Sequence, residues 1–77
     1  MRFRVMAKVA ALGGIQQNSR AEIFEQSQEL EARKQYSEVA KRIRSSHMYD
    51  FQQVILERER GDGTWERIDQ LTTEQLR

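Results

Sequence analysis

Hydrophobic and polar residues alternate near the start of the chain. In residues 2–9 every second residue is apolar, from Phe3 to Val9. A period of two residues is typical of a strand that buries one face and exposes the other. We therefore predict a strand over residues 2–9 whose exposed face is basic and carries Arg2, Arg4 and Lys8.

A helical spacing follows in residues 28–46. Apolar residues recur there at intervals of three or four, from Ala32 to Ile43, and fall on one side of a helix. Ser27 is a suitable N-cap, and cations in the last turns suit the negative end of the helix dipole. We predict an amphipathic helix over 28–46 that ends in Lys41, Arg42 and Arg44.

The segment between these two elements has two interpretations. Gly13-Gly14 and Asn18-Ser19 are turn signals. Residues 15–26 either form the return strand of a hairpin or extend the helix toward the N-terminus. Ile23 would point about 140° away from the apolar side of a continuous helix, which favours a break near Ser27.

Strand-forming residues return in 48–59, but their pattern is irregular. Either Ile55 continues the buried face or a bulge at Gln52-Gln53 resets it. Asp-Gly within Arg60–Gly63 is typical of a hairpin turn, and an apolar pattern resumes from Trp65 to Ile68. The prediction is an α+β fold of strand, strand, helix, strand and strand. One amphipathic helix packs on one face of a small antiparallel sheet.

We predict one domain over residues 1–70, with 71–77 as a C-terminal tail or a short helical turn. The expected core is thin for a chain that must offset about 1–2 kcal/mol of backbone entropy per residue. Self-association through exposed sheet edges would bury further surface. The expected core residues are Phe3, Val5, Val9, Ile23, Tyr36, Val39, Ala40, Ile43, Phe51, Ile55 and Ile68.

Composition excludes several classes of protein. The 77 residues include no cysteine, which excludes disulfides and thiol chemistry and is compatible with the cytoplasmic location that we expect. No apolar run is long enough to cross a membrane. The net charge of +1 hides an alternation: residues 1–20 carry four cations and no acid, and the three following segments, 21–38, 39–60 and 61–77, carry −3, +2 and −2.

Catalytic and metal-binding patterns are weak. Ser45, Ser46, His47 and Asp50 lie within six residues, but the members of a catalytic triad must converge in space, which neighbours on a turning chain rarely do. His47 and Asp50 alone are too few ligands for a metal site. We therefore expect no enzymatic activity, no cofactor and no metal.

The leading hypothesis is a non-enzymatic binding or accessory protein that acts through protein–protein contacts and forms a homodimer. The alternative is a nucleic-acid-binding module in which Trp65 stacks beside a basic sheet face. A small-ligand carrier or enzyme is disfavoured, because so short a chain offers little room for a pocket of about 300 Å³. In size and composition the chain resembles small accessory proteins of bacteria and phages. The candidate interaction residues are Arg2, Arg4, Lys8, Trp65, Lys41, Arg42 and Arg44.

Overall fold

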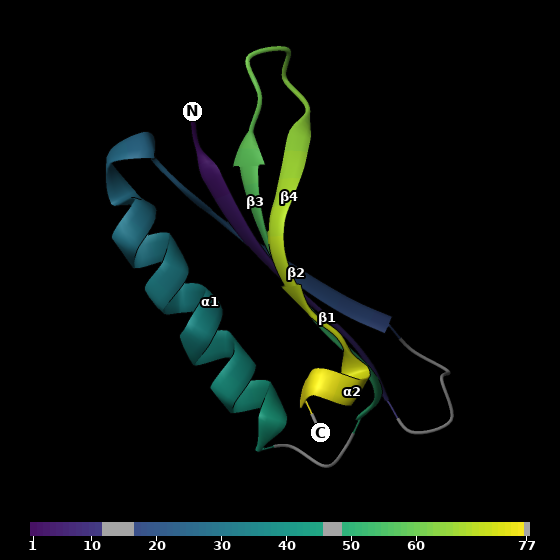
Figure 1. Cartoon of the computed structure of the whole chain (residues 1–77). Helices are drawn as coiled ribbons and strands as arrows, with labels where there is room; N and C mark the ends of the chain where they lie inside the picture. The colour runs from purple at the N-terminus through teal and green to yellow at the C-terminus, as the bar shows by residue number, and fades with distance from the viewer. Residues whose placement is uncertain (12–16, 46–48, 77) are drawn as a thin grey trace.

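Four antiparallel strands and one long helix make up most of the computed structural model, which describes residues 1–11, 17–45 and 49–76 (Figure 1). The sheet has the strand order β2-β1-β3-β4. The predicted α+β class is therefore confirmed. The elements are β1 (Phe3–Ala11), β2 (Gln17–Phe24), the 3₁₀ turn η1 (Gln26–Gln28), α1 (Glu29–Arg44), β3 (Tyr49–Glu59), β4 (Trp65–Leu71) and α2 (Thr73–Leu76).

Strand β1 lies in the middle of the sheet and follows the predicted alternation. Phe3 and Val5 are buried on the inner face, which we define as the face covered by α1. Arg4 and Lys8 lie on the opposite face, which we call the outer face, because successive side chains of a strand point to opposite sides. β1 pairs with β2 on one side and with β3 on the other.

The open question about residues 15–26 is answered by β2, which is a strand. Asn18 and Ser19, predicted as a turn, lie within it and pair with β1. The turn signal at Gly13-Gly14 lies outside the described residues. Ile23 was expected in the core but is 50% exposed, because β2 is an edge strand and Ile23 lies on the outer face opposite Arg4.

The helix begins close to its predicted position. The chain turns at η1, where the backbone N–H of Glu25 donates to the side-chain oxygen of Gln28 at 2.9 Å. Ser27, the predicted N-cap, lies within η1, and α1 follows from Glu29 to Arg44. The acidic side chains in its first turn and the basic ones in its last turn both suit the helix dipole.

Strand β3 resolves the irregular pattern of 48–59 without a bulge at Gln52-Gln53. Its pairing with β1 is regular from Phe51 to Arg58, and the register shifts opposite Ala10 and Ala11 instead. A second shift lies between Leu56 and Glu57, opposite β4. Val54 and Leu56 consequently face α1, whereas Ile55 is buried on the outer face and does not join the core cluster.

The predicted Asp-Gly hairpin joins β3 and β4. Gly63 has a φ of 86°, a left-handed conformation that glycine adopts without strain. The Asp62 carboxylate accepts hydrogen bonds from the Thr64 hydroxyl at 2.6 Å and the Thr64 backbone N–H at 3.0 Å. These bonds lower the pKa of Asp62. The geometry of the turn therefore explains why Gly63 and Asp62 occupy these positions.

The C-terminal residues after β4 form the short helical turn α2. Its Leu76 is buried in the main core, which the sequence pattern did not predict. Thr73 fastens this turn to β3: its hydroxyl donates to the Gln52 carbonyl and accepts from the Gln52 backbone N–H. Burial and the nearby Asp69 carboxylate raise the pKa of Tyr36, on α1, to about 12.

Candidate functional site

A single helix is too narrow to cover this sheet. Four strands about 4.8 Å apart span roughly 15 Å between the outermost strand axes, whereas a helix with its side chains is about 10 Å wide. α1 packs mainly on β1 and β3, so β2 is left largely uncovered. Every residue from Asn18 to Ile23 is exposed.

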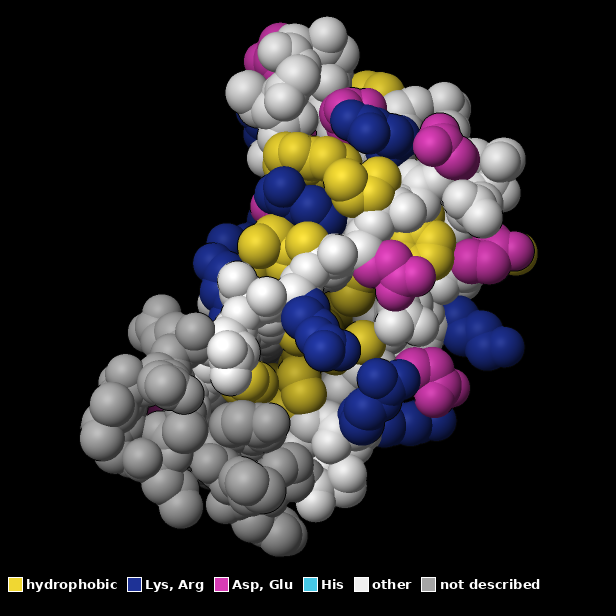
Figure 2. Space-filling view, turned by 180° about the vertical axis from the view of Figure 1, so that it is seen from behind, with side chains coloured by type: hydrophobic (Ala, Val, Ile, Leu, Met, Phe, Trp, Pro, Cys, Tyr) yellow, Lys and Arg dark blue, Asp and Glu magenta, His cyan; other side chains and the backbone are white. Residues whose placement is uncertain are grey.

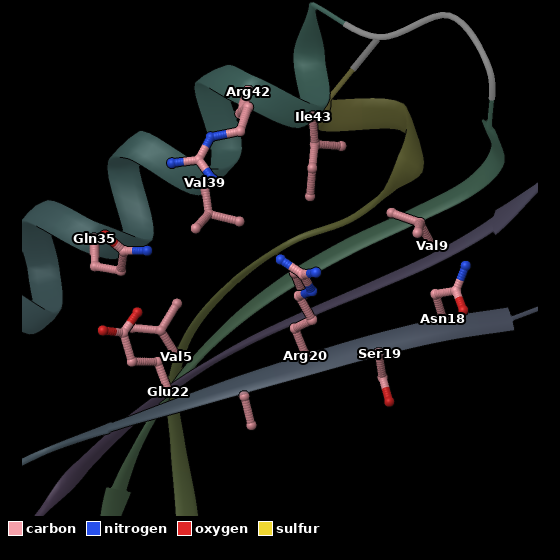
Figure 3. A pocket seen from close by; sticks show the side chains of 12 residues that line it. Val5, Val9, Asn18, Ser19, Arg20, Glu22, Gln35, Val39, Arg42 and Ile43 are labelled. Atoms are coloured by element: carbon pink, nitrogen blue, oxygen red, sulfur yellow. The ribbon is translucent and has the colours of Figure 1, made fainter.

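The uncovered area forms a groove of about 720 Å³ between α1 and the strands β1 and β2 (Figure 3). The expectation that so short a chain has little room for a pocket of about 300 Å³ was therefore wrong, because the volume of the groove is larger. The groove is partly open to solvent, because it arises from incomplete cover of the sheet. Its apolar lining side chains are Val5, Ala7 and Val9 of β1, and Val39 and Ile43 of α1.

Charged side chains stand at the rim of this groove. Arg20 and Glu22 project from β2 toward α1, and Arg42 projects from α1 toward the strands (Figure 3). Among the residues that the structure describes, these three side chains take part in no ion pair. The rim therefore offers one carboxylate and two guanidinium groups to a partner.

The backbone of β2 adds a second binding element to the groove. Among the described strands, β2 is the last of the sheet and pairs with β1 alone. A strand in this position presents unpaired backbone N–H and C=O groups along its outer side. We call this free edge, from Asn18 to Ile23, together with the groove beside it, the β2 surface.

The outer face carries the basic cluster that the sequence predicted, and two of its three cations, Arg2 and Arg4, are paired with carboxylates. Arg4 donates through Nε and Nη2 to one Glu57 oxygen, at 2.9 and 2.7 Å. Arg2 pairs with Glu59 at 2.8 Å. The Arg4 guanidinium carbon lies 4.3 Å from the centre of the Trp65 ring, and that of Arg2 lies at 5.9 Å. The expected placement of Trp65 among cations is thus present, with a carboxylate bound to each arginine.

Glu57 and Glu59 are the residues of this face that sequence reasoning missed. They stand two residues apart on β3 and therefore share one face of the strand. Their arginine partners lie on β1, more than 50 residues earlier in the chain. Only the register of β1 against β3 brings these charges together. Hydrogen bonding to Arg2 lowers the pKa of Glu59 below the ordinary value of a glutamate.

The seven predicted interaction residues do not form one surface. Arg2, Arg4 and Trp65 make contact on the outer face, and Lys8 lies farther along the same face of β1. The three helix cations lie at the other end of the fold: Arg42 lines the groove, Arg44 donates to the Gln75 carbonyl at 3.2 Å, and Lys41 is exposed.

We found no matching protein family, curated protein or solved structure. Within residues 1–11, 17–45 and 49–76, no group of three or more histidine and acidic side chains could hold a metal ion, and no helix is long and apolar enough to cross a membrane. Ser46 and His47 of the weak triad pattern lie outside the described residues.

Seen from behind, the molecule shows hydrophobic side chains in a broken strip along its middle, with charged side chains of both signs on either side (Figure 2). Among the side chains that this view colours, Asp and Glu are interspersed with Lys and Arg. Such mixed charge gives little long-range attraction for a polyanion.

We expect single-stranded oligonucleotides to bind weakly, with a Kd no tighter than about 100 µM, because Glu57 and Glu59 compete with phosphate for the arginines. Fluorescence anisotropy at low salt measures this affinity. Arg2→Ala tests the outer face, and Arg33→Ala is the matched control, since Arg33 pairs with Glu29 on the exposed side of α1. Micromolar binding that only Arg2→Ala weakens would contradict the expectation and support a nucleic-acid function.

Proposed function

We propose that this chain is a non-enzymatic binding protein that acts through protein–protein contacts at the β2 surface. One observation carries the proposal: an exposed strand edge runs beside an apolar groove, with charged side chains at its rim. The occupant that fits is an extended strand from a protein. It would continue the sheet at β2 and place alternate side chains over the groove.

Strand addition explains why both features lie together. The backbone of an added strand forms hydrogen bonds with the edge, which supplies affinity without regard to sequence. Its side chains alternate between the two faces, so those on the inner face meet Val39 and Ile43 and the charges of Arg20 and Glu22. Specificity then resides in the groove and its rim.

Photo-crosslinking in the source cells tests this proposal. A photoreactive amino acid at Ile23, which is half-exposed on β2, should form covalent adducts with a protein partner. The matched control places the same amino acid at Lys34, which is exposed on α1. We expect at least about fivefold more adduct from position 23, because crosslinking requires the partner to remain close.

The mass of the adduct identifies the partner. The yields of adduct from positions 23 and 34, compared with each other, test the proposal. Adducts that appear equally from Ile23 and Lys34, or from neither, would overturn binding at the β2 surface. An adduct of twice 9.1 kDa would show that the partner is another copy of this chain, and any other mass would show a different protein.

A further inference from the structure

We infer that the strand that docks on β2 is β2 of a second copy of this chain, antiparallel to the first, with the two-fold axis at Ala21. This inference rests on the proposed function and names its partner. It is carried by two charges on the inner face of β2, Arg20 and Glu22, neither of which has an ion pair within the part of the chain that the structure describes. They have opposite sign, stand two residues apart and point to the same side of the sheet (Figure 3).

The geometry of antiparallel pairing restricts how two copies can meet. Residues that lie opposite each other share a face of the sheet. A two-fold axis between identical strands therefore passes through a residue that faces its own copy, as an isologous interface requires. Three positions of the axis, at Arg20, Ala21 or Glu22, bring charged residues of the two β2 strands opposite each other.

Charge selects one of these three registers. An axis at Arg20 would place two guanidinium groups opposite each other, and an axis at Glu22 would do the same for two carboxylates. Like charges directly opposite each other on neighbouring strands are destabilising. An axis at Ala21 places Arg20 opposite the partner's Glu22, and does so twice by symmetry. The small side chain of Ala21 then faces its own copy.

The same register places the apolar grooves of the two copies side by side. The sheets join into one of eight strands, with the four strands of each copy in mirrored order. Each groove loses part of its open side to the adjoining copy. Charges on an edge strand ordinarily discourage pairing. Here the opposite charges of Arg20 and Glu22 disfavour the registers with the axis at Arg20 or at Glu22. They favour the register with the axis at Ala21.

Reversal of single charges tests both the dimer and its register. Arg20→Glu places two glutamates opposite each other at both contacts, and Glu22→Arg places two arginines there. Sedimentation equilibrium at low salt should give a wild-type Kd below about 100 µM and a Kd at least about tenfold weaker for each variant. An equimolar mixture of the two variants should recover the wild-type affinity to within about threefold, because every opposed pair is then Glu with Arg.

The control is Lys34→Glu on the exposed side of α1, which makes the same change of charge as Arg20→Glu and should leave the Kd unchanged. Circular dichroism shows that each variant is folded. A monomeric wild type at about 500 µM, single reversals without effect, or a mixture that fails to associate would overturn the inference. A monomer whose position 23 still crosslinks to another protein would leave the proposed function standing, whereas absence of crosslinks would overturn both.

Discussion

Leu56→Ala is expected to lower the free energy of unfolding by about 2–5 kcal/mol. Leu56 is 1% exposed and lies on β3, between β1 and β4 and beneath α1. Its truncation leaves a cavity at the centre of the thin core. Domains of this length have total stabilities of about 4–12 kcal/mol, so the loss is a large fraction. Urea denaturation followed by Trp65 fluorescence measures it.

Leu30→Ala is the matched control, because it removes the same atoms from a side chain that is 80% exposed on α1. We expect that substitution to change the free energy of unfolding by no more than about 0.5 kcal/mol. Equal losses from the two substitutions would show that Leu56 is not in the core. The comparison also excludes any general effect of leucine removal.

The elements with regular spacing could be predicted from the sequence. The alternation from Phe3 to Val9, the three- and four-residue spacing of α1 and the Asp-Gly turn each depend on neighbours within a few residues. The whole α+β arrangement follows from burying their apolar faces together. The placement of Trp65 among cations could be predicted as well, because the alternation of side chains along a strand assigns each residue to a face.

Features that depend on distant residues could not be predicted in this way. Leu76 belongs to a segment too short to show a period, and only tertiary packing buries it. Ile23 has the hydrophobicity of a core residue, but its exposure follows from the edge position of β2. The groove depends on where α1 crosses the sheet, which no local pattern determines.

The interaction candidates show the same division. The strand periods place Arg2, Arg4 and Trp65 on one face, as the structure does. The candidates did not include Glu57 and Glu59, which pair with the two arginines. Arg20 and Glu22 were not candidates either, because their importance depends on β2 being an uncovered edge. Their alternation is visible in the sequence, yet it acquires meaning only once the neighbours of β2 are known.

Glu57→Ala is expected to cost about 2 kcal/mol, between the values typical of surface and of buried ion pairs. The side chains of Glu57 and Arg4 are 11% and 25% exposed. Removal of Glu57 leaves the half-buried Arg4 without its acceptor, pressed against the Trp65 ring. A double-mutant cycle with Arg4→Ala and Glu57→Ala, measured by urea denaturation, isolates the coupling between the two.

The Arg58–Glu66 pair provides the matched control for this cycle, because it also joins two strands but its side chains are 46% and 39% exposed. We expect a coupling energy above about 1 kcal/mol for Arg4–Glu57 and below about 0.5 kcal/mol for Arg58–Glu66. In 1 M NaCl the exposed pair should lose most of its coupling and the covered pair should retain most of it. Equal couplings would mean that the outer face is fully solvated, in which case its arginines would be available to phosphate and a nucleic-acid surface would be favoured.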